Sequence, residues 1–270
     1  MCGCNTMKSN IYQKSYEVHY YETNFRLEAT PNTILGYLEE TATCHSETVG
    51  NNINLLSSSG LGWVVYRYNL QMSRYPYWQE KITITTWVEK FRRCFAYRNF
   101  YIYDSKDNLI GQAASIWILI DLKQKKPVRI PEKMVALYGT YPKTFPEVFS
   151  ELPKLETSSF IKEFKVGPTD IDINFHTNHK KYITWLLETI PFEVQKQAFP
   201  ASIEITYRKE STCNDHIQSQ CQELDKVHNR KCFLHYITCP EKEADLVIAR
   251  TTWENSSDSN LPRPFLLHSQ

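Results

Sequence analysis

The same order of predicted elements occurs twice along this chain, and that repetition is the strongest constraint on its fold. Thr30 and Pro31 can begin an amphipathic helix in the first half, which Gly50 would end. Asn178 can cap a second amphipathic helix, with Tyr182 on its apolar face. Segments with alternating apolar and polar residues predict strands around both helices. The predicted strands are 16–21, 63–72, 81–91, 94–103 and 109–121 in the first half, and 160–166, 201–208, 231–238 and 244–254 in the second.

Five prolines separate the two repeats. No sustained period runs through this part of the sequence, which is typical of a linker. The prolines are Pro127, Pro131, Pro142, Pro146 and Pro153. We therefore predict two domains, at residues 10–145 and 157–260, each with one long helix wrapped by an antiparallel sheet. The predicted fold class is α+β.

Composition and charge exclude several classes of protein. Hydrophobic residues make up 41% of the chain, so it can bury a core, and the net charge of +1 gives no general attraction to nucleic acid. The most apolar stretch, 113–122, contains Ser115 and Asp121 and is too short to cross a bilayer. Eight scattered cysteines favour reduced thiols and a cytoplasmic location, and no apolar segment of a signal peptide follows Met1.

The nearest approach to a metal-binding pattern lies between residues 228 and 239. It consists of His228, Cys232, His235 and Cys239. In the strand predicted here, Cys232 and His235 would point to opposite faces. We therefore predict buried thiols here and no metal site.

A polar motif precedes the second helix. Asp172, Asn174 and His176 occupy every second position. In an extended segment they would project from one face, with the intervening apolar residues on the other. An acid, an amide and an imidazole would then lie before the positive end of a helix, where a carbonyl oxygen that becomes negative is stabilised. The alternative is an Asn-rich turn that only starts the helix.

Several motifs together resemble one enzyme family. The segment 170–178, with Tyr182, Trp185 and Glu188 after it, resembles the catalytic segment of acyl-acyl carrier protein thioesterases, the FatA and FatB type of plants. The resemblance continues through 203–210 and through 115–117, and it covers residues 16–254. It implies two hotdog folds in tandem, hydrolysis of acyl thioesters that ends fatty acid synthesis, acyl carrier protein as the partner, and no cofactor. Plant members carry a transit peptide, whereas this fold is predicted to begin almost at Met1, so we expect a bacterial cytoplasmic member.

The resemblance also implies roles for individual residues. Glu210 and His176 would activate water, and Asn174 would orient that water or the carbonyl. Asp172 would hold the group together through hydrogen bonds, and backbone N–H groups at the start of the second helix would bind the oxyanion. Plant members commonly have a Cys after this glutamate, where this chain has Ser211. A serine needs a dedicated base, so we predict water as the nucleophile and keep Ser211 and Asn178 as further candidates.

The first half lacks the acidic motif and has residues 24–28, Asn-Phe-Arg-Leu-Glu, at the corresponding place. We predict that it binds the acyl chain, with Met72 and Trp87 among the candidate lining residues. A basic run could dock the acidic acyl carrier protein, or it could be only a solvated face. Its residues are Lys123, Lys125, Lys126 and Arg129.

Other assignments stay open from the sequence. An acyl-CoA thioesterase would share the chemistry and differ in the carrier. A hotdog dehydratase would pair one His with one acid, and an acyl-binding module would lack the polar group of residues. Pairing of two copies through their sheets would give a homodimer.

Overall fold

The computed structural model describes residues 10–141, 149–227 and 230–255. Its first half contains β1 (Ile11–Glu17), α1 (Pro31–Thr48), α2 (Ile53–Ser58), β2 (Leu61–Met72), β3 (Lys81–Arg92), β4 (Phe95–Asp104), β5 (Leu109–Asp121), β6 (Lys126–Pro127) and α3 (Glu132–Tyr138). Its second half contains β7 (Phe160–Lys165), α4 (His179–Thr189), α5 (Phe192–Gln197), β8 (Ala198–Tyr207), β9 (His216–Val227), β10 (Arg230–Cys239) and β11 (Ala244–Asn255). Single 3-10 turns at Tyr20–Glu22 and Pro168–Asp170 precede α1 and α4.

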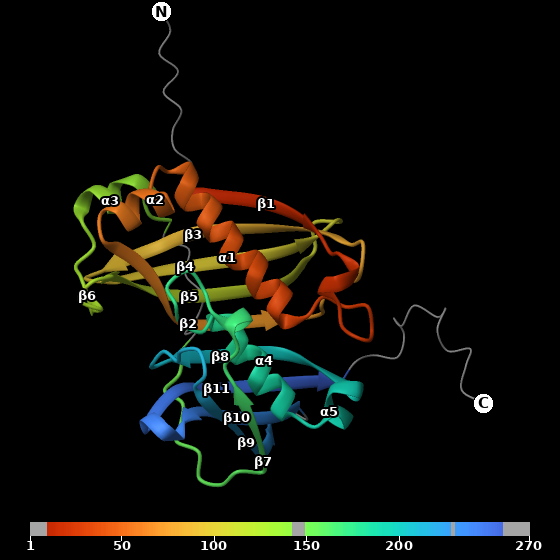
Figure 1. Ribbon diagram of the computed structural model, residues 1–270. Helices are drawn as coiled ribbons and strands as arrows, with labels where there is room; N and C mark the ends of the chain where they lie inside the picture. Colours follow the sequence, from red (N-terminus) through yellow and green to blue (C-terminus); the bar gives the residue numbers. More distant parts are fainter. Residues whose placement is uncertain (1–9, 142–148, 228–229, 256–270) are drawn as a thin grey trace, which may run out of the picture.

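In the described part of the chain, eleven strands form one antiparallel sheet. The order is β1-β3-β4-β5-β2-β8-β11-β10-β9-β7, and β6 pairs with the end of β5. The halves join where β2 pairs with β8, with Leu70 opposite Ile203. Figure 1 shows α1 and α4 on the same side of this continuous sheet, each across its own half. This is the tandem hotdog that the family resemblance implies, and the α+β class is confirmed.

Local sequence explains both long helices. The Thr30 hydroxyl accepts a hydrogen bond from the Thr33 N–H at 3.1 Å, and Pro31 occupies the first helical position of α1. Gly50, at φ +82°, follows the helix end as predicted. The Asn178 side chain caps α4 by accepting from the Lys180 N–H at 3.0 Å. The apolar face of α1 is buried over its whole length, at Ile34, Leu35, Leu38, Thr41, Ala42 and His45.

The two helices also contact each other above the β2–β8 junction. Asn32 donates to the Thr184 hydroxyl at 2.6 Å, and Lys180 pairs with Glu39 at 2.9 Å. One hydrophobic core runs beneath both helices and includes side chains from both halves, such as Leu38, Leu70, Leu186 and Ile203. The halves therefore share a core rather than meeting only at their surfaces.

Three sequence predictions about secondary structure were wrong. The strand expected at 16–21 is β1, which ends at Glu17, because a 3-10 turn begins at Tyr20. Strand β9 was not predicted, since polar and charged residues occupy most of its positions. Helix α3 lies in the stretch expected to be only a linker. The expected domain limits at 145 and 260 lie outside the described residues. No described helix is both long and apolar enough to span a membrane.

Candidate active site

The polar motif before α4 forms a tight turn, not the extended segment that its alternation predicts. The Asp172 N–H donates to the His176 carbonyl at 2.8 Å, and Phe175 has φ +62°. The physical reason is Asp172, whose carboxylate accepts from the Asn174 N–H at 2.8 Å and weakly from the His176 N–H at 3.5 Å. Such local side-chain bonds compete with strand pairing and fold the backbone back on itself.

This turn exposes the residues that an extended segment would bury. Ile173 is 80% exposed and Phe175 is 82% exposed, so the predicted apolar face does not exist. The Asn174 side chain is exposed as well and has no hydrogen-bond partner among the described residues. The turn therefore presents an amide and two apolar side chains to an incoming ligand.

The structure brings His176 and Glu210 together, as the family resemblance implies. His176 Nε2 lies 3.1 Å from Glu210 Oε2. The His176 side chain is 16% exposed and that of Glu210 is 45% exposed, so the pair lies at the surface of the fold and is open to water. Asp172 acts on this pair through the backbone of the turn, because its carboxylate accepts from the main-chain N–H groups of Asn174 and His176.

Ser211 occupies a different environment from its neighbour Glu210. It is fully buried, and its hydroxyl bonds with the hydroxyls of Thr177 at 2.7 Å and Tyr182 at 2.8 Å. The Tyr182 oxygen also accepts from the Ser211 N–H at 3.0 Å, and burial raises the pKa of Tyr182. Among the described contacts, Ser211 Oγ meets no imidazole or carboxylate that could serve as its base.

The start of α4 differs from the expected oxyanion site. Asn178 uses its side chain to accept from the Lys180 N–H and its carbonyl to accept from the Lys181 N–H at 2.8 Å. Two of the N–H groups at the helix start therefore already have partners. Asn178 is a helix cap, and the positive end of the helix dipole remains next to the turn.

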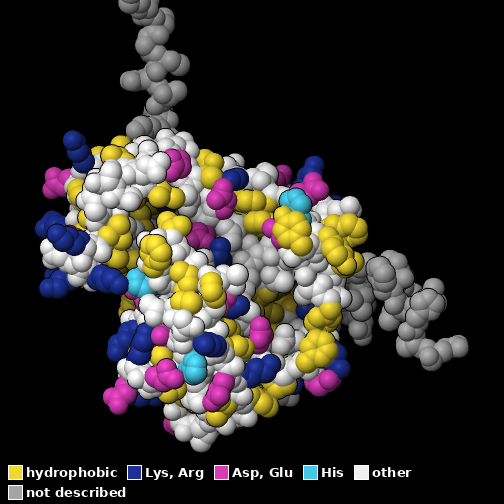
Figure 2. Space-filling model, viewed as in Figure 1, with side chains coloured by type: hydrophobic (Ala, Val, Ile, Leu, Met, Phe, Trp, Pro, Cys, Tyr) yellow, Lys and Arg dark blue, Asp and Glu magenta, His cyan; other side chains and the backbone are white. Residues whose placement is uncertain are grey.

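The basic run lies at the turn between β5 and β6, in the first half of the chain. Lys123, Lys126 and Arg129 are exposed there. Figure 2 shows Lys and Arg side chains gathered at the left edge of the molecule, where Figure 1 places β6. Lys125 behaves differently, since its Nζ lies 3.0 Å from His176 Nε2. Sequence reasoning missed this contact, which joins residues from different halves.

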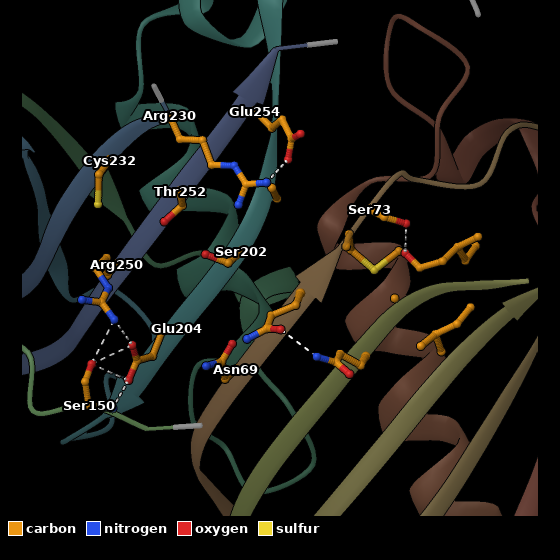
Figure 3. A pocket seen from close by; sticks show the side chains of 17 residues that line it. Asn69, Ser73, Ser150, Ser202, Glu204, Arg230, Cys232, Arg250, Thr252 and Glu254 are labelled. Atoms are coloured by element: carbon orange, nitrogen blue, oxygen red, sulfur yellow. Dashed lines mark hydrogen bonds and ion pairs between the residues drawn. The ribbon is translucent and has the colours of Figure 1, made fainter. Parts of the chain in front are cut away.

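A large groove lies elsewhere, on the face of the sheet away from α1 and α4. It has a volume of about 1110 Å³ and crosses the β2–β8 junction. Figure 3 shows Glu204 there beside Arg250 and Ser150. Arg67 and Arg250 approach the Glu204 carboxylate at 3.1 and 2.8 Å, so its charge is neutralised. No residue of the candidate catalytic group lines this groove.

Strand β10, which carries Cys232, His235 and Cys239, is a buried part of the sheet. His235 Nε2 bonds with the Thr251 hydroxyl at 2.8 Å, and burial lowers the pKa of His235 to about 3. Cys232 and Cys239 are free and buried on the same strand, while His228 lies outside the described residues. No three metal-ligating side chains cluster within the ranges that the structure describes.

Two family models match the two halves in order. The acyl-ACP thioesterase N-terminal domain matches residues 9–138, and the acyl-ACP thioesterase C-terminal domain matches residues 153–255. The chain belongs to the acyl-ACP thioesterase family. This confirms the resemblance that the separate sequence motifs indicated.

Relatives and solved structures agree with this membership. The Cuphea viscosissima chloroplastic acyl-[acyl-carrier-protein] hydrolase FATB2 is 26% identical over 90% of this chain, which spans 62% of that relative's length. A Lactobacillus plantarum protein described as an oleoyl thioesterase has a TM-score of 0.85 at 24% identity, covering 92% of this chain and 97% of that one. The 12:0-ACP thioesterase of Umbellularia californica has a TM-score of 0.81 at 21% identity, covering 93% and 96%. These structures share the fold of this acyl-ACP thioesterase family member.

Proposed function

We propose that the protein hydrolyses acyl thioesters of acyl carrier protein and releases free fatty acids, which ends fatty acid synthesis. The observation that carries this proposal is the contact of 3.1 Å between His176 Nε2 and Glu210 Oε2 beside the exposed Asn174. An imidazole and a carboxylate in hydrogen-bond contact can take a proton from water, and a thioester needs only activated water and stabilisation of its oxyanion. Family membership supplies the class of substrate.

In the proposed reaction, water bound beside His176 and Glu210 loses a proton to this pair. The resulting hydroxide attacks the thioester carbonyl and forms a tetrahedral oxyanion. The carbon–sulfur bond then breaks, the carbonyl reforms, and the proton held by the pair passes to the departing thiolate. One thioester and one water give one carboxylic acid and one thiol, and the pair returns to its starting state.

Ser211 supports water as the nucleophile rather than a covalent route. Its hydroxyl is buried and bonded to Thr177 and Tyr182, so neither a substrate carbonyl nor a base reaches it in this arrangement. We assign it to fixing the backbone next to Glu210. This leaves Glu210 as the acid–base group and Ser211 as its support.

We assign orientation of the carbonyl to Asn174. Its amide is exposed on the turn, and no described residue competes for it. The N–H groups of Lys180 and Lys181, by contrast, are bonded to Asn178. An amide donor next to the positive end of α4 would stabilise the oxyanion. Removing this donor should lower the rate by about 10²–10³-fold.

We further propose that the first half, at residues 10–145, holds the acyl chain, while the second, at 157–260, performs the chemistry. Met72 lies in the core under α1 and fits this role. Trp87 does not, because it packs on Tyr101 and Tyr141 on the other face of the sheet. Truncating Met72 should therefore change chain-length preference, measured with a series of acyl chains, while Trp87 variants should change stability alone.

Carrier docking is assigned to the residues of the basic run other than Lys125, namely Lys123, Lys126 and Arg129. Reversing these charges should lower kcat/KM for an acylated carrier about tenfold and leave a small acyl thioester unaffected, because charges at an interface rim act mainly on association. Added salt should reduce the difference in kcat/KM between the parent and the charge-reversed protein on the acylated carrier. Equal losses on both substrates would show that the run supports the fold instead.

The proposed activity is tested with purified protein and one acyl group on three thiols: acyl carrier protein, coenzyme A and N-acetylcysteamine. Release of free thiol is followed in time, and the preferred carrier is expected to be acyl carrier protein. Faster turnover of acyl-CoA would favour the acyl-CoA thioesterase alternative. Water loss from a 3-hydroxyacyl substrate would favour a dehydratase, and binding without turnover would favour an acyl-binding module.

A cytoplasmic location, a bacterial source and a homodimer stay predictions from the sequence. The free cysteines among the described residues are the observation that supports a reducing compartment. Sedimentation of the purified protein at several concentrations tests the homodimer.

A further inference from the structure

Lys125 comes from the first half of the chain but meets the imidazole of the second. Its Nζ lies 3.0 Å from His176 Nε2. The turn that presents it is fixed by Asp121, whose carboxylate accepts from the N–H groups of Lys123 and Gln124 at 2.9 and 2.7 Å. The Asp121 carbonyl also accepts from the Lys125 N–H at 2.8 Å. The ammonium is therefore presented by an ordered turn.

The backbone of Lys125 adds a second observation. Its φ is +53°, in the left-handed region that glycine and asparagine adopt with less strain than lysine. A lysine here therefore carries backbone strain. The left-handed residue closes the turn, and its side chain is the one that reaches His176.

The two charged partners of His176 make incompatible demands on one nitrogen. An ammonium only donates, so its contact requires an unprotonated Nε2. An ionised carboxylate only accepts, so the contact of Glu210 with Nε2 at 3.1 Å requires an Nε2–H. The contact with Lys125 therefore favours the form with an unprotonated Nε2, before the imidazole takes a proton from water. The contact with Glu210 favours the form with an Nε2–H, after the proton has been taken.

We propose that Lys125 is a positioning residue of the hydrolytic site, which holds the His176 ring in place by donating to its unprotonated Nε2. The charged groups that face His176 are Lys125 from the β5–β6 turn, Glu210 after β8, and Asp172 within its own turn. Lys125 is the cation of this set and opposes both carboxylates. Its role rests on the proposed hydrolysis and assigns part of the site to the first half of the chain.

The test compares the parent protein with Lys125→Gln, Lys125→Arg and a matched control, Lys106→Gln, in the exposed loop at the opposite end of β5. Each is assayed from pH 5 to 9 with an acylated carrier and with the N-acetylcysteamine thioester. Lys125→Gln should lose about tenfold in kcat/KM near neutral pH on both substrates. Lys125→Arg should recover most of the activity, and Lys106→Gln should match the parent.

Loss on the carrier alone would assign Lys125 to docking and overturn the proposal. Unchanged rates on both substrates would overturn it as well. A second measurement does not depend on activity: the NMR signals of the His176 ring, assigned by their absence in His176→Gln. The Nε2 signal should change in Lys125→Gln and stay unchanged in Lys106→Gln, and no change in Lys125→Gln would refute the role. A parent protein that hydrolyses neither thioester would refute the proposed function, while the NMR result would still decide the role of Lys125.

Discussion

The turns that precede α1 and α4 have the same backbone and opposite chemistry. In the first half, the Asn24 N–H donates to the Glu28 carbonyl at 2.8 Å. In the second, the Asp172 N–H donates to the His176 carbonyl at the same distance. The Asn24 side chain accepts from the Arg26 N–H at 2.8 Å, as Asp172 does from Asn174. The repeat that orders the whole fold therefore extends to single hydrogen bonds.

The equivalent side chains differ where chemistry would occur. In the first half, Arg26 and Glu28 form an ion pair of 2.8 Å that is almost fully buried. Arg26 also donates to the carbonyl of Gln195 in the second half. In the second half, Asn174 and His176 occupy these two positions and remain accessible. One copy of the turn is closed by a buried ion pair, and the other keeps these side chains accessible.

The segments that pair with the two turns also share their backbone hydrogen bonds and differ in their side chains. The Ala29 N–H donates to the Pro76 carbonyl at 2.8 Å, as the Thr177 N–H does to the Ser211 carbonyl at 2.9 Å. The residue before Pro76 is the buried Tyr75, whereas the residue before Ser211 is Glu210. The turn is thus a feature of the fold of both halves, and three side-chain differences separate the structural copy from the candidate catalytic one.

The largest expected effect on turnover comes from substituting the equivalent residues, His176 and Glu28, of the two turns separately. His176→Ala should lower turnover of an acylated carrier by about 10²–10⁴-fold, because the acid–base group is lost. Glu28→Gln at the equivalent position should leave kcat within about threefold. Rates are measured by thiol release, with circular dichroism to establish that both variants fold. A folded His176→Ala protein that turns over at the parent rate would remove His176 from the mechanism.

Glu210 and Ser211 are adjacent and should separate into a rate effect and a stability effect. Glu210→Gln should lower kcat by about 10²-fold or more, because the carboxylate that takes the proton is gone. Ser211→Ala should lower kcat less than tenfold and cost about 1–2 kcal/mol in the free energy of unfolding, since the buried hydroxyls of Thr177 and Tyr182 lose a partner. Urea denaturation measures the free energy of unfolding, and mass spectrometry detects any acyl adduct on Ser211. An acyl adduct on Ser211 that forms and decays at the turnover rate would contradict the water route.

The buried ion pair of the first turn should matter to folding alone. Arg26→Met leaves Glu28 buried without its cation and should cost about 3 kcal/mol in the free energy of unfolding. The double variant Arg26→Met/Glu28→Leu should recover most of this loss, because neither charge then remains. Both proteins, assayed where they are folded, should keep kcat within about threefold. A large loss of kcat in the stable double variant would show that the first turn also acts on the reaction.

The sequence predicted the fold well because its markers are local. Thr30, Asn178 and Gly50 mark helix ends through backbone chemistry that depends on neighbouring residues alone. Alternation placed β5 at its observed limits, Leu109–Asp121. It failed for β9, whose solvent face and part of whose buried face are polar.

The candidate site was harder to predict than the fold, because it depends on a local side-chain bond and on how the two halves pack. Period-two spacing at Asp172, Asn174 and His176 suits a strand, but the carboxylate of Asp172 bonds to its own backbone and makes a turn. The pairing of His176 with Glu210 followed from the family resemblance, not from spacing. The contact of Lys125 with His176 depends on how the halves pack, which no local pattern encodes.

The smallest expected effect concerns whether the two halves unfold together. His45 in the first half and His235 in the second are buried, and burial lowers the pKa of each to about 3, with the Arg98 charge adding to the effect on His45. In the unfolded chain both return to about 6.5. The unfolded state then binds more protons between these values, so stability is full above about pH 6.5 and falls as the pH is lowered toward 3.

From pH 7.5 to 5.5, each histidine should therefore contribute a loss of about 1.4 kcal/mol in the free energy of unfolding. His45→Gln and His235→Gln should each flatten the pH dependence by that amount, measured by urea denaturation at both values. Because one core contains side chains from both halves, each variant should shift a single common transition. Two transitions, with His45→Gln moving one and His235→Gln the other, would show that the halves are energetically separate despite their shared core.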